Sequence, residues 1–113
     1  MHELAITQRI LEIAIASAAG QSAQRITKIK LRIGQFTGVV RESIEFAFDA
    51  VKRGTIAEGA GLEIEMVQLR KRCPACNQIM ASDTGYDFLC SWCKGPVEIL
   101  SGRELQIEYI EAD

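Results

Sequence analysis

Four cysteines, arranged as two Cys-x2-Cys pairs, constrain this chain of 113 residues more than any other feature. Cys73 and Cys76 form the first pair, and Cys90 and Cys93 form the second after a gap of 13 residues. Two residues between thiolates let one tight turn present both sulfurs to a single ion. Two such turns complete a tetrahedral shell of four sulfurs, which is typical of structural zinc and leaves no open position for catalysis.

Three other interpretations of the cysteines are weaker. A redox dithiol needs only one pair and sits at a strand-to-helix junction that the pattern lacks. A rubredoxin-type iron site uses the same four ligands, but its pairs lie farther apart in sequence. Disulfides are disfavoured in the reducing cytosol, where we expect this chain to reside.

Hydrophobic periodicity predicts two helices outside the cysteine segment. The first covers residues 3–19 and ends at Gly20, and the second ends before Gly54. Their apolar stripes contain, in chain order, Leu4, Leu11, Ala14 and Ala18, then Val40, Ile44, Phe48 and Val51.

Three segments alternate apolar and polar residues and are predicted to be strands: 27–33, 61–69 and 103–110. The polar face of the first is basic, whereas those of the other two are acidic. Because opposite charges stabilise neighbouring strands, we predict that the first strand pairs with at least one acidic strand. The apolar faces are predicted to contain Thr27, Ile29, Leu31 and Ile33; Leu62, Ile64 and Met66; and Leu105, Ile107 and Tyr109.

These elements predict an α+β fold, in which a three-stranded sheet with two helices carries an inserted zinc-ribbon module. The α/β domain is discontinuous, comprising residues 1–70 and 101–113, and the Zn(Cys)4 domain comprises residues 71–100. A net charge of −2 and a pI of about 5.5 argue against binding to nucleic acid or to an anionic membrane. We find no transmembrane span and no signal peptide, and therefore expect a cytoplasmic protein.

His2 is the only histidine in the chain and lies beside the amine of Met1. That amine, the His2 backbone nitrogen and the His2 Nδ1 atom together form two fused chelate rings. Such a planar nitrogen set suits Ni(II) or Cu(II) rather than zinc, and Glu3 is the nearest source of a fourth donor. The chemistry alone leaves copper open, and a histidine near a terminus is more often an exposed side chain without a ligand.

The order of several motifs along the whole chain resembles the HypA/HybF family of nickel metallochaperones, which act in [NiFe]-hydrogenase maturation. These motifs are MHEL at the start, IGQFTGV, RGTIAEGAGLEIE, the two cysteine pairs and GRELQIEYIE. The resemblance implies that Met1, His2 and Glu3 bind Ni(II) as transient cargo. It also implies that Cys73, Cys76, Cys90 and Cys93 bind structural Zn(II).

The resemblance further implies a non-enzymatic carrier that works with a HypB-type GTPase and delivers nickel to the hydrogenase large subunit. In some bacteria the family also serves urease maturation proteins. We expect a monomer or a weak homodimer that binds neither nucleic acid nor membrane. The alternative function is a zinc-ribbon adaptor or nucleic-acid-binding module, which the acidic pI disfavours. A thiol oxidoreductase is excluded if zinc occupies the thiolates.

Overall fold

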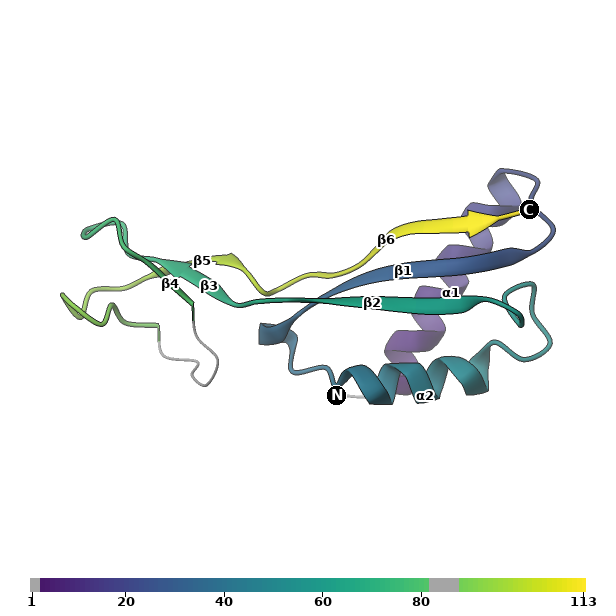
Figure 1. Cartoon of the computed structure of the whole chain (residues 1–113), viewed down its shortest axis with the longest axis horizontal. Helices are drawn as coiled ribbons and strands as arrows, with labels where there is room; N and C mark the ends of the chain where they lie inside the picture. Colours follow the sequence, from purple (N-terminus) through teal and green to yellow (C-terminus); the bar gives the residue numbers. More distant parts are fainter. Residues whose placement is uncertain (1–2, 82–87) are drawn as a thin grey trace.

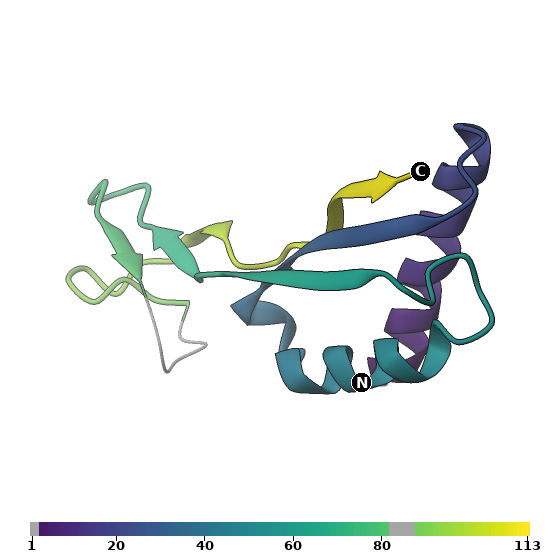
Figure 2. The same ribbon diagram turned by 45° about the vertical axis from the view of Figure 1, so that its right-hand side comes forward.

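The computed structural model describes residues 3–81 and 88–113, which form an elongated molecule of 55 × 25 × 16 Å. Figures 1 and 2 show two sheets at opposite ends of this long axis. We call the larger end the α/β lobe and the end with the cysteines the cysteine lobe. Within the described ranges, no helix combines the length and the apolar character needed to cross a membrane.

The α/β lobe contains a three-stranded sheet in the order β2-β1-β6, with both helices packed on one face (Figure 2). Strand β1 pairs in parallel with β2 and antiparallel with β6. The predicted fold class is therefore confirmed. The elements of this lobe are α1 (Glu3–Gly20), β1 (Ile26–Gly34), the 3-10 turn η1 (Gln35–Thr37), α2 (Arg41–Val51), β2 (Gly61–Val67) and β6 (Leu105–Ala112).

The cysteine lobe contains a second sheet of three short strands in the order β4-β3-β5, with both pairings antiparallel. Its strands are β3 (Arg70–Arg72), β4 (Ile79–Ala81) and β5 (Glu98–Ser101). Two residues separate β2 from β3, and three residues separate β5 from β6. The cysteine lobe is thus inserted between two strands that flank β1 in the larger sheet.

Charge pairing on the outer face of the larger sheet confirms the predicted pairing of the basic strand with an acidic strand. The Glu63 carboxylate on β2 forms ion pairs with the Lys28 and Lys30 ammonium groups of β1, with nitrogen–oxygen distances of 2.7 and 2.9 Å. These hydrogen bonds, with that of Lys28 the stronger, lower the pKa of the Glu63 carboxyl from 4.5 to about 2. Farther along the same pair of strands, Arg32 lies 3.8 Å from Glu65. The central basic strand is therefore neutralised by its acidic neighbour.

The core lies between the inner sheet face and the two helices. Two residues of the predicted helical stripes are exposed instead: Leu4, at 51%, and Val40, at 50%. On the predicted apolar strand faces, Met66 and Leu105 are also exposed, at 36% and 41%. Leu4 lies in the first turn of α1, where it borders an open groove, and Val40 precedes α2 in an extended conformation. The buried side chains of the two helices and of the larger sheet are Thr7, Ile10, Leu11, Ala14, Ala18, Ile26, Ile29, Leu31, Ile33, Ile44, Ala47, Phe48 and Ile64.

The predicted apolar face of the last strand is wrong at Tyr109. The register between β1 and β6 shifts, so that Lys30 opposes Tyr109 whereas Leu31 opposes Ile107. One extra residue in a strand reverses the face of everything beyond it. Tyr109 therefore lies on the outer face, with its ring 5.7 Å from the Lys28 ammonium. Ile110 packs against the core in its place.

A second register shift explains why Thr27 is not in the core. Ile26 opposes Ala112 and Lys28 opposes Glu111, so Thr27 is left as the extra residue on β1. Thr27 is exposed and its hydroxyl donates to the Glu111 carbonyl, whereas Ile26 is fully buried. The regular alternation of this strand therefore begins at Lys28.

The two lobes meet at a close crossing between the end of β1 and the segment that joins β5 to β6. The Gly34 N–H donates to the Glu104 carbonyl at 2.7 Å. A Cβ atom on Gly34 would lie 2.6 Å from the Arg103 nitrogen and closer still to the Gly102 carbonyl group. Gly102 itself has φ +111°, which favours glycine. The crossing therefore requires glycine in both of the chain segments that meet there.

Candidate metal centre

Two turns of matching conformation carry the four cysteines. In each turn the N–H of the first cysteine donates to a carbonyl five residues later, and the residue after the second cysteine has a positive φ. That residue donates its own N–H back to the first cysteine's carbonyl. The paired residues are Cys73, Asn77 (φ 57°) and Gln78 in the first turn, and Cys90, Lys94 (φ 63°) and Gly95 in the second. The sequence repeat thus folds into two equivalent turns.

The turns bring all four sulfurs together. Their Sγ atoms lie within 4.8 Å of one another, with 3.6 Å between Cys73 and Cys93 and 4.0 Å between Cys76 and Cys90. Zinc–sulfur bonds of about 2.3 Å in a tetrahedron give sulfur–sulfur separations of about 3.8 Å. The observed separations bracket that value and are too long for disulfides, whose S–S bonds are about 2.05 Å. The donor set therefore fits a tetrahedral thiolate-bound ion.

Backbone N–H groups point at the sulfurs and favour their anionic form. Cys93 and Trp92 donate to the Cys90 sulfur at 3.5 and 3.4 Å. These backbone donors lower the pKa of the Cys90 thiol to about 7. By contrast, hydrogen bonding with the Cys93 thiol, together with burial, raises the pKa of Cys76 to about 12. One anionic sulfur thus disfavours ionisation of its neighbour, and a bound cation removes this conflict.

The cysteine cluster is partly open to solvent. Cys73 and Cys90 have no exposed surface, whereas Cys93 is exposed. Sharing one ion requires three or more His, Cys, Asp or Glu side chains that lie close together. Among residues 3–81 and 88–113, these four cysteines are the group that meets this condition. Four protein ligands complete a tetrahedral shell, which suits a structural ion rather than a reactive one.

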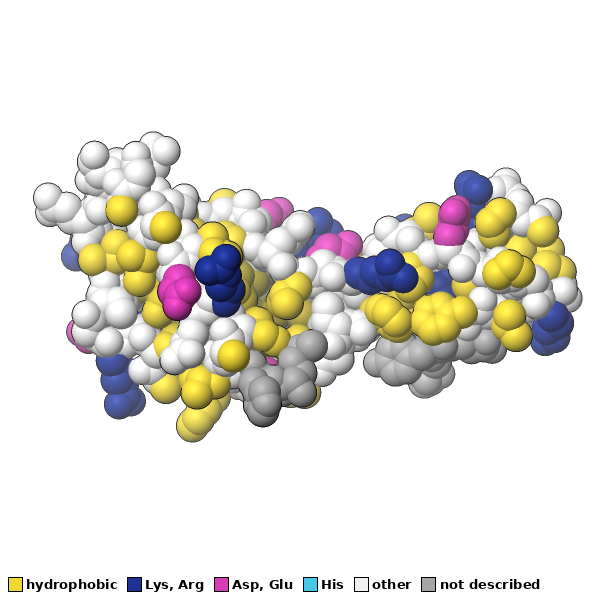
Figure 3. Space-filling model, turned by 180° about the vertical axis from the view of Figure 1, so that it is seen from behind, with side chains coloured by type: hydrophobic (Ala, Val, Ile, Leu, Met, Phe, Trp, Pro, Cys, Tyr) yellow, Lys and Arg dark blue, Asp and Glu magenta, His cyan; other side chains and the backbone are white. Residues whose placement is uncertain are grey.

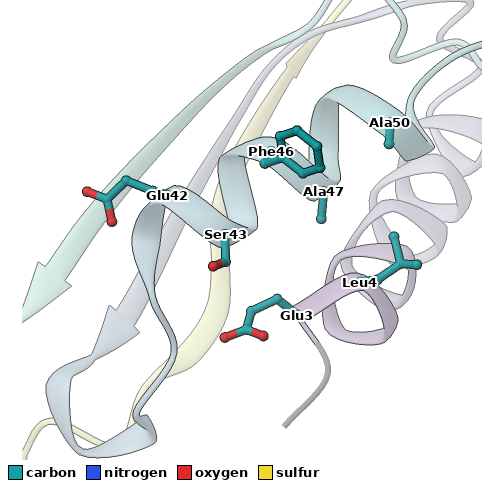
Figure 4. Close-up of a pocket in the computed structure, with 7 residues that line it drawn as sticks. All are labelled: Glu3, Leu4, Glu42, Ser43, Phe46, Ala47 and Ala50. Carbon is teal, nitrogen blue, oxygen red and sulfur yellow. The ribbon is translucent and has the colours of Figure 1, made fainter.

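The predicted nickel end is described only in part. Met1 and His2 lie outside the described residues, and Glu3 is the first residue of α1. Figure 4 shows Glu3 on one side of a groove and Glu42 and Ser43, from the first turn of α2, on the other. The groove has a volume of about 570 Å³ and is lined by Glu3, Leu4, Glu42, Ser43, Phe46, Ala47 and Ala50.

Sequence periodicity did not identify this groove, because it forms where two helices separated by the first strand come together. Phe46 is its clearest feature, since 80% of this large apolar side chain is exposed on α2. Helical spacing places Phe46 off the buried stripe of Ile44 and Phe48, which is a signal of an exposed aromatic residue. An exposed phenylalanine beside Glu3 makes this end of the lobe partly apolar.

Comparisons with known proteins agree along the entire chain. A family model described as "Hydrogenase/urease nickel incorporation, metallochaperone, hypA" matches residues 1–112. The hydrogenase maturation factor HypA of Geotalea uraniireducens is 42% identical over the full length of both chains. That of Roseiflexus sp. is 38% identical over 98% of this chain and 91% of the relative.

Solved structures give the same fold. The solution structure of the Ni metallochaperone HypA from Helicobacter pylori has a TM-score of 0.70 and covers 99% of this chain and 97% of its own. A second structure, described as the solution structure of HypA protein, has a TM-score of 0.73 and covers 100% of this chain and 97% of its own. Both are 19% identical to this chain, so this likeness concerns the fold alone.

The resemblance inferred from the motifs is therefore confirmed by a match that includes both ends of the chain and the cysteine segment. The family description is that of a metallochaperone and not of an enzyme, in agreement with the sequence-based expectation. This chain belongs to the HypA family of nickel metallochaperones for hydrogenase maturation.

Proposed function

We propose that this protein carries Ni(II) and delivers it to the large subunit of [NiFe]-hydrogenase during maturation, while a structural Zn(II) ion stabilises its cysteine lobe. The observation that carries the proposal is the family match over residues 1–112, which includes the terminal Met-His-Glu sequence and all four cysteines. We assign residues 1–70 and 101–113 to the nickel-binding domain and residues 71–100 to the zinc-binding domain.

The zinc ligands in this proposal are Cys73, Cys76, Cys90 and Cys93. Sulfur separations of 3.6 and 4.0 Å and N–H donors to the thiolates support this assignment. The cysteine lobe has short strands and few buried apolar residues, so metal binding supplies much of its folding free energy. The zinc ion acts as a structural cross-link between the two cysteine turns.

The nickel ligands in this proposal are the Met1 amine, the His2 backbone nitrogen, the His2 Nδ1 atom and a donor from Glu3. Three nitrogen donors in one plane suit the square geometry of Ni(II). Because His2 is the only histidine in the chain, no second imidazole is available to enclose the ion. Three strong donors and one replaceable donor let a recipient protein take the ion by ligand exchange.

The amine must lose its proton before it binds nickel, and this makes binding depend on pH. An N-terminal amine has an unperturbed pKa of roughly 7.7–8.0. Protons therefore compete increasingly with nickel as the pH falls from about 8 to 6. The same competition is weaker for a zinc ion held by four thiolates within a folded lobe.

A HypB-type GTPase is the proposed partner in nickel loading, and urease maturation proteins are an additional recipient system. We propose that the protein works in the cytoplasm as a monomer or a weak homodimer. The relatives are hydrogenase maturation factors, which supports a place for this protein among hydrogenase maturation components.

Metal analysis of the untagged protein tests this function. We expect one tightly bound zinc per chain and, after addition of Ni(II), one labile nickel with the absorption spectrum of a planar complex. His2→Ala, or a short N-terminal extension that removes the free Met1 amine, should abolish tight nickel binding and leave the zinc content unchanged. Gln8→Ala, on the exposed face of α1, is the matched control and should bind both metals.

Two outcomes of this experiment would contradict the proposal. Unchanged nickel affinity in the N-terminally extended protein would exclude a site centred on the amine. Zinc without any nickel in the unmodified protein would favour the zinc-ribbon adaptor instead.

A further inference from the structure

Two aromatic rings connect the lobes next to the glycine crossing. The ring of Phe36, in η1, meets the ring of Phe88 edge to face, with centroids 5.5 Å apart and an interplanar angle of 89°. Arg103 lies over the Phe36 ring at 5.8 Å. Figure 3 shows the narrow waist of the molecule at which the lobes meet. Phe36 of the α/β lobe thus contacts both the cysteine lobe, through Phe88, and the segment that joins the two lobes, through Arg103.

The position of Phe88 depends on the second cysteine turn. Phe88 lies two residues before Cys90, and its carbonyl accepts the Val97 N–H at 3.1 Å. Between these ends, the Cys90 N–H donates to the Gly95 carbonyl at 2.7 Å. The turn that presents Cys90 and Cys93 to the metal therefore also holds the backbone of Phe88. Without a bound ion, the second cysteine turn is no longer cross-linked to the first turn, so these hydrogen bonds are less well supported.

Phe36, in turn, belongs to the segment that starts α2. Its N–H donates to the Gly102 carbonyl at 2.8 Å, and the Thr37 hydroxyl donates to the Gly34 carbonyl at 2.7 Å. Three residues after η1 the chain enters α2, where the Ser43 N–H donates to the Val40 carbonyl at 3.1 Å. Ser43 lines the groove beside Glu3 (Figure 4). A short continuous segment thus joins Phe36 to that groove.

We propose that the Phe36–Phe88 contact is a latch that makes the order of η1 and of the first turn of α2 depend on metal loading of the cysteine cluster. With the cluster closed, Phe88 holds Phe36, and η1 is fixed at the lobe crossing. With the cluster open, the backbone hydrogen bonds of η1 break more often, and the first turn of α2 frays with it. The latch rests on the metal-binding role proposed above for the four cysteines, and it does not involve nickel.

Amide hydrogen exchange of the full-length protein, followed by NMR without nickel, tests this latch. The reporters are the hydrogen-bonded amides of Phe36 and Ser43, and the Ala14 amide within α1 is the internal reference. In the zinc-loaded protein, Phe88→Ala should speed exchange at both reporters about 2- to 10-fold, as expected for loss of an edge-to-face aromatic pair. Removing zinc from the unsubstituted protein should speed exchange at the same amides and leave Ala14 unchanged.

Two further variants separate the latch from general damage to the cysteine lobe. Trp92→Ala removes an exposed ring from the same cysteine turn and should exchange like the unsubstituted protein. Phe36→Leu changes the other side of the contact and leaves both cysteine turns intact, so it should reproduce the effect of Phe88→Ala. The absorption spectrum of Co(II) bound to the cysteines should match in all three variants, which shows that the cluster is still formed.

The double variant completes the test. If the two rings act as one contact, Phe36→Leu adds little to the effect of Phe88→Ala at Ser43. Exchange at Phe36 and Ser43 that is unchanged by Phe88→Ala in the metal-loaded protein, or unchanged by zinc removal in the unsubstituted protein, would overturn the proposal. Because no arm contains nickel, failure of the nickel proposal gives a different result from failure of the latch.

Discussion

Gly34→Ala provides the sharpest test of how the two lobes are joined. A Cβ atom on residue 34 would lie 2.6 Å from the Arg103 nitrogen, whereas an ordinary contact needs 3.4 Å or more. The approach to the Gly102 carbonyl group is closer still, and all the opposing atoms belong to backbone. The crossing chain must therefore move by about 1 Å or more, and no side-chain rotation can relieve the overlap.

The cost follows from what this movement breaks. Overpacking of a rigid site costs about 1–3 kcal/mol. The shift also weakens the hydrogen bonds from Gly34 to Glu104 and from Phe36 to Gly102, each with a net value of about 0.5–1.5 kcal/mol. We therefore expect a destabilisation of about 3 kcal/mol, which corresponds to a fall in Tm of about 12 °C for a chain of this size.

Thermal unfolding of the zinc-saturated protein, followed by far-ultraviolet circular dichroism, measures this change. Gly20→Ala is the matched control, because a Cβ atom at Gly20 meets no atom within 4 Å and the residue lies within α1. That substitution should stabilise the protein by about 0.4–1 kcal/mol, because it reduces the freedom of the unfolded chain. A Gly34→Ala variant with an unchanged Tm would refute the close crossing.

Three other predictions concern metal and charge. The Cys90→Ser variant should lose zinc to a chelator far faster than the unsubstituted protein, as measured by atomic absorption. The Ser91→Ala control should retain its zinc. Equal zinc retention by Cys90→Ser and the unsubstituted protein would contradict a four-sulfur site. Because the folded protein lowers the pKa of Glu63 from 4.5 to about 2, this carboxylate stabilises the fold fully above pH 4.5 and progressively less as the pH falls towards 2. The difference in unfolding free energy between the unsubstituted protein and Glu63→Gln should therefore be constant near neutrality and shrink in acid, and a difference that stays constant down to pH 2 would be contrary to this. Nickel affinity, measured by calorimetric titration, should weaken as the pH falls from about 8 to 6 while zinc remains bound; a flat nickel profile would count against the Met1 amine as a ligand.

Local chemistry explains which features the sequence predicted correctly. The cysteine turns depend on a spacing of two residues and on hydrogen bonds within six residues, so the repeat was sufficient to predict the cluster. The pairing of β1 with at least one acidic strand was also predictable, because the charges of Lys28, Lys30 and Glu63 alternate with apolar residues in their own strands.

Features that depend on pairing between distant segments were not predictable in this way. The outward position of Tyr109 results from a register shift against β1, which the alternation of β6 alone does not contain. The Phe36–Phe88 contact and the groove beside Glu3 likewise form only after segments far apart in sequence have met. The assignment of nickel to Met1 and His2 remains a prediction, since both residues lie outside the described structure.

The cysteine lobe is attached by two chain segments that lie against each other. A Cβ atom on Gly102 would be only 2.8 Å from the Leu69 Cα atom, and the Ser101 hydroxyl donates to the Gln68 carbonyl at 2.8 Å. The two ends of the insertion are thus already as close as the ends of a tight turn. We expect that a short turn in place of residues 70–101 would preserve the β2-β1-β6 order. The closeness of these two segments therefore makes the lobe a unit that can be removed or exchanged without changing the register of the sheet that carries it.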